Sequence, residues 1–453
     1  MVPRPNRAAA QDKLPRWPEP PAKPDHVARV YRCDLAERSI RRVIARIPSR
    51  ASNRLNPARP PLAENPAPGV VIACVNDCPC QALPYTSQMA KRVCYVHIGP
   101  HKTGTTSIQW FLKENRAELL KHGYFVPESR NISGGHHPLV RQLCGQAMPP
   151  HQRETVTTFA SAIKDTTCEA IVISSETLDD LLVNQNCAGH FFSRMEEFNL
   201  EPKLVFFPRN QSQVLNSRYT EVIKAFHRSE RFETFVQTEI RHPSFRYAHL
   251  IALADAFQSE LIAQPFTEET ITRGVVPEFL RAIDIDPAQF QDMDVRRNPG
   301  AGPFTVSVAR DVLRSLGSEA RGLTWLQASR CGKKFAAYLE ERNLADSGYC
   351  GLTTALAGHI ETEWRQDNDA FAQAAWGRSW AEVFPGDVGR EFKPNDFEVC
   401  APGWAVRRRL RRAVRQMKTM VREMLLEPAL GIKAAWNDVQ KRNSGFAENK
   451  SSG

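Results

Sequence analysis

RVCYVHIGPHKTGTTSIQWFLKENRAELL, residues 92–120, combines three patterns that decide the fold. VCYVHI (93–98) is a short apolar run, which is typical of a strand buried on both faces. The loop GPHKTGTTS (99–107) follows and contains two glycines. A helix pattern comes next, because its apolar residues fall on one broad face, and Gly123 stands where a glycine ends such a helix. The apolar residues of this helix are Ile108, Phe111, Leu112, Leu119 and Leu120.

Three further apolar runs predict buried strands: AIVIS (170–174), KLVFF (203–207) and ELIAQ (260–264). Helical patterns separate them, and strands that alternate with helices favour a parallel sheet with helices on both faces. Residues 305–385 are mostly helical in pattern. The sequence therefore predicts an α/β domain over residues 92–390. No apolar stretch reaches the ~18 residues that a membrane-spanning helix requires.

Both ends of the chain differ from this domain. The chain has 453 residues, and 15 of its 32 prolines fall within residues 1–91, which disfavours helices and central strands there. We expect this Pro/Arg-rich segment to be disordered, with one helix near Leu35–Ile47. Residues 391–453 form a basic tail, in which residues 403–426 place apolar side chains at helical spacing among arginines. Such a helix either lies on an anionic membrane or a partner, or packs on the domain.

The positive charge of the chain belongs to its ends. The formal net charge is +10, of which residues 1–91 carry +8, residues 401–453 carry +8 and residues 92–400 carry −6. A basic groove across the fold is the usual footprint of a nucleic-acid-binding protein. The central domain lacks that composition, so we expect no nucleic-acid partner.

The cysteines indicate a reducing compartment. The chain has 11 of them, an odd number without regular spacing, which is typical of free thiols in the cytoplasm. Cys74, Cys78 and Cys80 lie close together, but no fourth zinc ligand stands at a fitting distance. Prolines near the N-terminus interrupt any apolar core of a signal peptide. Because a strand pattern begins just after Met89, either Met1 or Met89 could be the natural start.

The loop at 99–107 has the composition of an anion site. A glycine-containing loop that runs into a helix presents backbone N–H groups and the positive end of the helix dipole. A P-loop nucleotidase would read G-x-x-x-x-G-K-[ST], and Gly99 and Gly104 have that separation. However, Thr105 stands where that motif requires lysine, and Lys102 precedes the second glycine instead. The loop therefore favours a phosphate-like ligand but weakens the case for an ATPase or GTPase.

HIGPHKTGTTSIQ (97–109) resembles the 5′-phosphosulfate loop of sulfotransferases that use 3′-phosphoadenosine 5′-phosphosulfate (PAPS). A second element of that family is an arginine at a strand end with a serine eight residues later, and Arg209 and Ser217 have this spacing. ISSE (173–176) and DNDAFAQAAW (367–376) are similar to segments of bacterial members. The resemblance spans roughly residues 92–390. It implies the P-loop-like sulfotransferase fold.

The resemblance also implies roles for individual residues. Lys102 would stabilise the leaving phosphate oxygen, and Arg209 with Ser217 would hold the 3′-phosphate. PAPS is the expected co-substrate, no metal ion is implied, and catalysis would depend on positioning and electrostatic stabilisation. The loop would hold the 5′-phosphosulfate, and His101 would mainly shape the loop. The donor-binding residues of the loop are His101, Lys102, Thr103, Gly104, Thr105, Thr106 and Ser107.

Some group must also take the proton of the acceptor hydroxyl. Glu176 is the first candidate, because it follows a strand at the edge where ligands of a parallel sheet gather. His136 and His137 are the competitors, since an unperturbed histidine has a convenient pKa. The sequence does not identify the residue that contacts the adenine, because Ser107 stands where the cytosolic animal enzymes have an aromatic residue. Phe266 is the candidate to take the place of that aromatic residue.

The predicted activity is therefore transfer of a sulfuryl group from PAPS to a hydroxyl. The bacterial resemblance points to a carbohydrate or glycolipid acceptor. The alternatives are a Mg²⁺-dependent nucleotide kinase and a non-catalytic nucleotide-binding protein of the membrane surface. We expect a cytoplasmic location, with peripheral contact to the inner membrane face through residues 403–426. The sequence leaves the oligomeric state open.

Overall fold

The computed structural model describes residues 90–129, 131, 134–148, 155–291 and 300–426, all within the compact unit 86–453. Three features considered above lie outside these described residues. They are the Pro/Arg-rich segment with its expected helix, the cysteines at 74–80 and the tail beyond residue 426.

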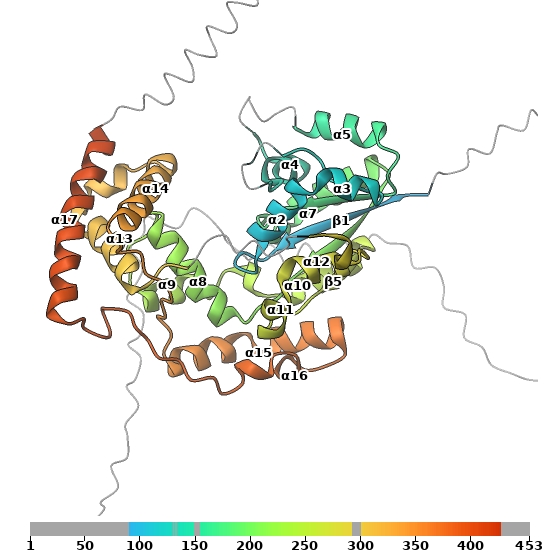
Figure 1. Cartoon of the computed structure of the whole chain (residues 1–453). Coiled ribbons are helices and arrows are strands. Elements are labelled where there is room, and N and C mark those ends of the chain that lie inside the picture. The colour runs from blue at the N-terminus through green and yellow to red at the C-terminus, as the bar shows by residue number, and fades with distance from the viewer. Residues whose placement is uncertain (1–89, 130, 132–133, 149–154, 292–299, 427–453) are drawn as a thin grey trace, which may run out of the picture. The chain divides into compact units, whose positions relative to one another are not determined.

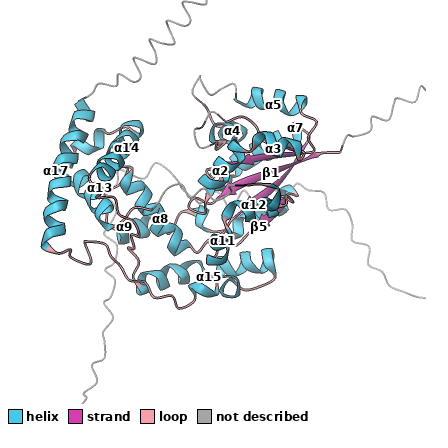
Figure 2. Ribbon diagram, in the orientation of Figure 1, coloured by secondary structure: helices cyan, strands magenta, loops and turns pink. Residues whose placement is uncertain are grey.

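Five parallel strands form the central sheet in the order β2-β3-β1-β4-β5. Figure 2 shows the strands in magenta among the cyan helices, with β1 and β5 labelled. Because β1 is central, Val96 lies opposite Ile173 of β3 on one side and Leu204 of β4 on the other. The α/β class and four of the strands are thus confirmed, whereas β2 has only two residues and leaves no pattern in the sequence. The strands are β1 (Arg92–Gly99), β2 (Tyr124–Phe125), β3 (Ala170–Ser174), β4 (Leu200–Phe206) and β5 (Glu260–Ala263).

Helices cover both faces of the sheet, because successive side chains of a strand point to opposite faces. Cys94, Val96 and Ile98 of β1 are fully buried in a core shared with α4, α5, α6, α7 and α10. Tyr95 belongs to the core on the other face, which α2 and α12 share. The helices between and around the strands are α2 (Thr105–Glu114), α3 (Arg116–Lys121), α4 (His137–Leu143), α5 (Thr155–Asp165), α6 (Leu178–Leu182), α7 (Gln185–Glu197), α10 (Ala248–Phe257), α11 (Glu268–Arg273) and α12 (Val275–Ala282).

The helix expected between the loop and Gly123 is divided at Asn115. The Asn115 side-chain amide donates to the Phe111 carbonyl at 3.0 Å, and the Asn115 N–H donates to the same carbonyl at 2.9 Å. Asparagine side chains compete with helical backbone bonds in this way. α2 therefore ends at Glu114 and α3 begins at Arg116, while Gly123 follows α3 with a φ of +84° as the sequence predicts.

A second group of helices shares a separate apolar core, in agreement with the helical pattern predicted for 305–385. The helix predicted within residues 403–426 is α17, and its apolar face lies in this core against α13 and α14 (Figure 1). Within the described part of the chain, no helix combines the length and apolar character that crossing a bilayer demands. The remaining helices are α8 (Gln211–Lys224), α9 (Phe232–Glu239), α13 (Pro303–Leu316), α14 (Trp325–Glu341), α15 (Thr354–Trp376), α16 (Trp380–Val383) and α17 (Trp404–Leu426). α15 belongs to both cores, because Trp364 lies in the separate core and Phe371 in the core of the sheet, against which Trp380 of α16 also packs.

A buried ion pair anchors α13 to the segment that precedes α17. The Arg310 guanidinium donates to both carboxylate oxygens of Asp396 at 2.8 Å, and the Tyr349 hydroxyl donates to the same carboxylate at 2.7 Å. Only 1% of the Arg310 side chain is exposed. Burial raises the pKa of Asp396, but the contacts with Arg310 outweigh this effect and leave it below its usual value. Removing one partner of such a pair leaves an uncompensated buried charge.

We expect the substitution Arg310→Met to lower the free energy of unfolding in urea by about 3–5 kcal/mol. The matched control is Arg314→Met, one turn further along α13, where the guanidinium pairs with Glu398 and is 35% exposed. That change should alter stability by no more than about 1 kcal/mol. Adding Asp396→Asn to Arg310→Met should restore part of the loss. An Arg310→Met protein as stable as the wild type would contradict this role.

Candidate functional site

The carboxyl ends of the parallel strands meet at one edge of the sheet, where ligands of such sheets bind. Backbone hydrogen bonds continue just beyond the strands, since the Ser175 N–H donates to the His97 carbonyl at 2.9 Å. The Phe207 N–H likewise donates to the Gly99 carbonyl at 3.0 Å. The loop after β1 is therefore flanked by the segments that follow β3 and β4. Those segments carry the predicted site residues Glu176 and Arg209.

Two glycines let the loop close against its neighbours. Gly99 has a φ of +110° and Gly104 a φ of +79°, in the region that favours glycine. A Cβ added to Gly99 would lie 3.3 Å from the Cα of Glu176. One added to Gly104 would lie 2.6 Å from the Cγ1 of Val275, which is closer than real Cβ contacts. Both positions therefore require glycine for conformation and for space.

Internal contacts hold the loop in shape. Thr103 is fully buried, and its hydroxyl donates to the Pro100 carbonyl at 2.8 Å. Lys102 has a φ of +71°, a left-handed conformation that disfavours residues with a side chain by about 1–2 kcal/mol. The Thr103 hydroxyl is thus used within the loop.

The loop ends at the N-terminus of α2, with Gly104 as the cap residue. The first N–H groups of a helix have no carbonyl one turn earlier to accept them, and the helix dipole adds partial positive charge. The Ser107 N–H donates to the Gly104 carbonyl at 2.9 Å. The backbone N–H groups of Thr105 and Thr106 therefore have no carbonyl of α2 to accept them. The Thr105 side chain is buried, whereas those of Thr106 and Ser107 are partly exposed.

Arg209, at the junction of β4 and α8, reaches the loop directly. Its guanidinium donates to the Lys102 carbonyl at 2.8 Å and to the Gln213 side-chain oxygen at 3.0 Å. The Phe266 ring lies 5.3 Å from the centre of the guanidinium. Burial lowers the pKa of Arg209, but an arginine stays protonated at neutral pH. The structure thus brings Lys102, Arg209 and Phe266 together at one place.

One face of α8 connects Arg209 with the Lys102 ammonium. Gln213, Ser217 and Glu221 follow each other at four-residue intervals, which places them on the same face of the helix. Gln213 contacts Arg209, and Glu221 forms an ion pair with the Lys102 Nζ at 3.1 Å. Ser217 therefore lies on α8 between the residues that make the two contacts.

The segment at 367–376 supports this arrangement from α15. Asn368 exchanges two side-chain hydrogen bonds with Gln211 at the start of α8, with lengths of 2.6 and 3.0 Å. Asp367 accepts the Ala248 N–H at 3.2 Å at the start of α10. The Asp367 and Asn368 pair thus fixes the beginning of two helices, one of which follows Arg209 immediately.

Glu176 lies on the other side of the loop, within a polar cluster. The Gln109 side-chain amide donates to one Glu176 carboxylate oxygen, and the Nε2 of His137 lies 3.5 Å from the same oxygen. Burial raises the pKa of Glu176, but His137 and His101 nearby more than offset this and leave it below its usual value. Glu176 is therefore a carboxylate at neutral pH, with 17% of its side chain exposed.

His136 and His137 have different environments. His136 is 2% exposed, and its two ring nitrogens lie 3.1 Å from the Pro127 carbonyl and the Ser174 N–H. The His136 ring is thus occupied by backbone groups, and the structure does not bring it to the open side of the loop. His137 turns toward Glu176, with its Nδ1 2.9 Å from the Ser175 hydroxyl.

His101 takes part in a further polar group. A ligand atom of His101 and carboxylate oxygens of Asp179 and Asp180 lie within 4.8 Å of one another. Asp180 Oδ1 has no hydrogen-bond partner among the described residues, and His242 Nδ1 lies 3.9 Å from it. Burial and the neighbouring Asp180 carboxylate raise the pKa of Asp179 well above its usual value. These residues could hold a cation together, but nothing in their arrangement requires one.

Several members of the site left no signal in the sequence. Gln109 is the last residue of the motif at 97–109, but nothing in that motif indicates its contact with Glu176. Gln213 and Glu221 lie on one face of α8, and only the fold reveals their contacts. Asp387 accepts a hydrogen bond from Gln213 at 2.6 Å, and the Arg390 guanidinium lies 3.5 Å from the Asp387 carboxylate. Arg390 thus adds a second guanidinium beside Arg209, from a segment 181 residues further along the chain.

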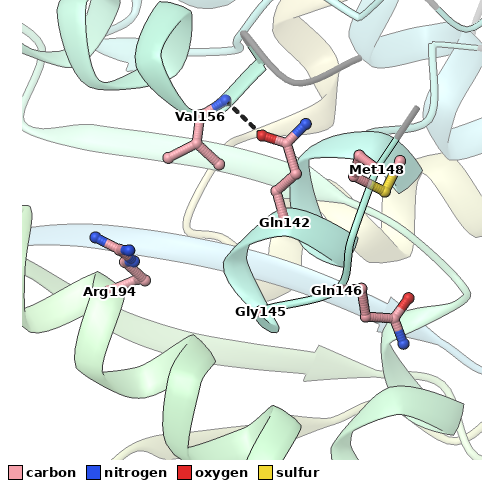
Figure 3. A pocket seen from close by; sticks show the side chains of 6 residues that line it. All are labelled: Gln142, Gly145, Gln146, Met148, Val156 and Arg194. Carbon is pink, nitrogen blue, oxygen red and sulfur yellow. Dashed lines mark hydrogen bonds between the residues drawn. The ribbon is translucent and has the colours of Figure 1, made fainter. Parts of the chain in front are cut away.

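A hollow between α4, α5 and α7 lies apart from these residues (Figure 3). It has a volume of about 280 Å³ and includes Gln142, whose side-chain oxygen accepts the Val156 N–H at 3.2 Å. Its other lining residues are Gly145, Gln146, Met148 and Arg194. None of the predicted site residues lines this hollow, so it carries no part of the functional argument.

Comparisons of the chain with protein-family models, with curated proteins and with solved structures find no match. The contacts around the loop are therefore the basis for a functional inference.

Two buried histidines should make the protein sensitive to acid. Burial lowers the pKa of both His97 and His136 to about 4, from an ordinary value of 6.5. The folded state therefore favours the neutral forms of both histidines. Their contribution to the free energy of unfolding is complete above pH 6.5 and is lost as the pH falls toward 4. We expect each histidine to remove roughly 2–3 kcal/mol of stability over this range, measured by urea unfolding at pH 7 and pH 4.5.

The variant His97→Asn should be less stable at pH 7 but should lose less stability on acidification than the wild type. The control variant is His190→Asn, at an exposed position, and it should leave the acid sensitivity unchanged. Equal acid sensitivity of His97→Asn and wild type would show that the burial of His97 does not govern it.

Proposed function

We propose that this protein is a PAPS-dependent sulfotransferase that transfers a sulfuryl group to a hydroxyl. The observation that supports this most directly is the hydrogen bond from the Arg209 guanidinium to the Lys102 carbonyl, at 2.8 Å. Lys102 is expected at the 5′-phosphosulfate end of the donor and Arg209 at the 3′-phosphate. One bisphosphorylated nucleoside could therefore contact both groups at the same edge of the sheet.

Donor binding would exchange one partner of Lys102 for another. Lys102 pairs with Glu221 in the free protein, and the two side chains are 25% and 46% exposed. Ion pairs of this exposure contribute at most about 1 kcal/mol. A phosphosulfate held by the N–H groups of the loop and of α2 would offer the ammonium a stronger partner in a less polar place. The pair with Glu221 then orients Lys102 without blocking it.

The reaction follows from these positions. The acceptor oxygen forms a bond to sulfur while the bond between sulfur and the 5′-phosphate oxygen breaks, and the products are a sulfate ester and adenosine 3′,5′-bisphosphate. Lys102 stabilises the negative charge on the leaving phosphate oxygen. Glu176 accepts the acceptor's proton, since it is already a carboxylate at neutral pH and lies beside Gly99 at the start of the loop. Gln109 and His137 hold the carboxylate in place.

The surroundings of Glu176 favour a polar acceptor. His101, His137 and Asp180 lie on this side of the loop, and groups of this kind hydrogen-bond readily to the hydroxyls of a carbohydrate or the head of a glycolipid. The seven cysteines of the described residues are all free thiols, which is compatible with a cytoplasmic location. We therefore place the reaction in the cytoplasm, with a carbohydrate or glycolipid as the acceptor.

Calorimetric titration tests the donor site. We expect adenosine 3′,5′-bisphosphate to bind more tightly than ATP, because Arg209 and Ser217 meet a 3′-phosphate that ATP lacks. Arg209→Ala should weaken bisphosphate binding by roughly 10- to 100-fold, the range for a lost hydrogen bond to a charged group. Glu221→Gln should leave the affinity equal or higher, because it frees Lys102. Equal or tighter binding of ATP by the wild type would contradict the proposal and favour a kinase.

Adenosine 5′-monophosphate separates a direct role of Arg209 from a role in holding the loop. It lacks the 3′-phosphate, so Arg209→Ala should weaken its binding much less than that of the bisphosphate. An equal loss for both nucleotides would mean that Arg209 acts only by supporting Lys102 and the loop.

Turnover tests the base. Transfer of labelled sulfate from PAPS would be followed with the best acceptor from a panel of glycosides and glycolipids. Glu176→Gln should lower turnover by roughly 10²- to 10⁴-fold and leave bisphosphate affinity nearly unchanged, because the amide cannot take a proton. His136→Asn should mainly lower the melting temperature, since its ring is buried among backbone groups. If a histidine variant alone abolished turnover, the assignment of Glu176 would be wrong.

A further inference from the structure

The apolar face of α17 is fully used inside the protein. Ala413, Met417, Val421 and Met424 are at most 3% exposed and belong to the core that α13 and α14 share. The Gln327 side-chain amide of α14 donates to the Met424 carbonyl at 3.2 Å. An interfacial helix inserts its apolar face among lipid chains. The apolar side chains of α17 are thus taken up by the protein core, which agrees with the alternative that residues 403–426 pack on the domain.

The opposite face of α17 is basic and exposed. Trp404, Arg408, Arg411, Arg412 and Arg415 follow each other at helical spacing, and all are exposed. Trp404 is 70% exposed, and the Arg408 guanidinium lies 5.6 Å from the centre of its ring. We call these five residues the arginine face.

Within the described part of the chain, the basic residues of α17 that have fixed partners lie in its C-terminal half. Arg422 forms a bidentate pair with Glu319 at 2.7 and 2.8 Å, and Lys418 donates to the Ser315 carbonyl at 2.7 Å. These contacts fix the C-terminal half of α17 to its neighbours. Among the described residues, no ion pair involves an arginine of the arginine face. α17 contains eight basic residues and one acidic residue, so the unpaired charge is concentrated at its N-terminal half.

We propose that the arginine face binds the surface of a bilayer that contains anionic lipids. Arginines near such a surface attract the lipid head groups, and tryptophan prefers the boundary between head groups and chains. Val399, five residues before Trp404, is also exposed, at 61%. An exposed tryptophan at one end of a straight row of arginines therefore fits a flat anionic surface. Residues 92–400 carry a net charge of −6, which disfavours a polyanion that wraps around the domain.

Co-sedimentation of the full chain with vesicles tests this proposal. We expect binding to vesicles of 7:3 phosphatidylcholine and phosphatidylglycerol at low salt, little binding to pure phosphatidylcholine, and release at high salt. The triple variant Arg408→Glu, Arg412→Glu and Arg415→Glu should lower the partition coefficient by more than 100-fold, since each arginine contributes roughly fivefold. Trp404→Ala should lower it by a smaller factor that persists at higher salt.

The control variant changes the net charge equally at exposed sites elsewhere: Lys121→Glu, Lys164→Glu and Arg281→Glu. It should bind vesicles nearly as well as the wild type, and both triple variants should keep the melting temperature.

Wild-type binding retained by the α17 variant would place the lipid contact elsewhere in the chain, for example in residues 1–91. An equal loss in both triple variants would reduce the effect to net charge. Tighter binding to heparin or duplex DNA than to vesicles, lost in the α17 variant, would assign the arginine face to a polyanion. Each of these three results would overturn the proposal.

Discussion

The hydrogen bond between the Arg209 guanidinium and the Lys102 carbonyl joins the two segments on which the site depends. These segments follow β1 and β4, which are adjacent in the sheet although 107 residues separate the two partners in the chain. Arg209 is largely buried, so its contact with the carbonyl acts in a less polar medium than water and is correspondingly strong. It supports Lys102 in a backbone conformation that a lysine seldom adopts. The shape of the loop and the position of Arg209 are therefore set together.

The loop separates two electrostatic environments. On the side of α8 lie Lys102, Arg209 and Arg390. Lys102 pairs with Glu221 and Arg390 lies 3.5 Å from Asp387, so a bound anion would replace these carboxylates as the partner of the two cations. On the other side are Glu176, Asp179 and Asp180 with three histidines, His101, His137 and His242. Sulfuryl transfer needs positive charge at the leaving oxygen and a proton acceptor at the attacking oxygen, on opposite sides of the sulfur. The charge distribution around the loop has this polarity.

Local sequence patterns were sufficient for the parts of the fold that are continuous in the chain. The apolar runs predicted β1, β3, β4 and β5, because a strand buried on both faces leaves a short uninterrupted run. They could not predict β2, which has two residues, or the break at Asn115, which depends on a side chain competing for a carbonyl. Strand ends placed Glu176 and Arg209 at the same edge before any contact was known. The different environments of His136 and His137 arise because the His136 ring bonds to the main chain at Pro127 and Ser174, a contact that no local pattern encodes. The apolar stripe of α17 is also ambiguous in the sequence, since a core and a lipid phase require the same spacing.

The helices outside the sheet do more than add apolar core, because they determine where α8 begins. Asn368 of α15 satisfies the Gln211 side chain in a buried place, at 4% and 2% exposure. A buried amide that loses its partner destabilises a protein by about 1–3 kcal/mol, so α8 cannot shift along α15 without that penalty. Gln211 follows Arg209 by two residues, and the Tyr247 hydroxyl donates to the Arg209 carbonyl at 2.8 Å. The main chain at Arg209 is thus fixed from α15 and from the start of α10, while its guanidinium is held by the Lys102 carbonyl and by Gln213. The position of Arg209 therefore depends on helices far from the loop in sequence, so the spacing of an arginine and a serine does not by itself define the geometry of the site.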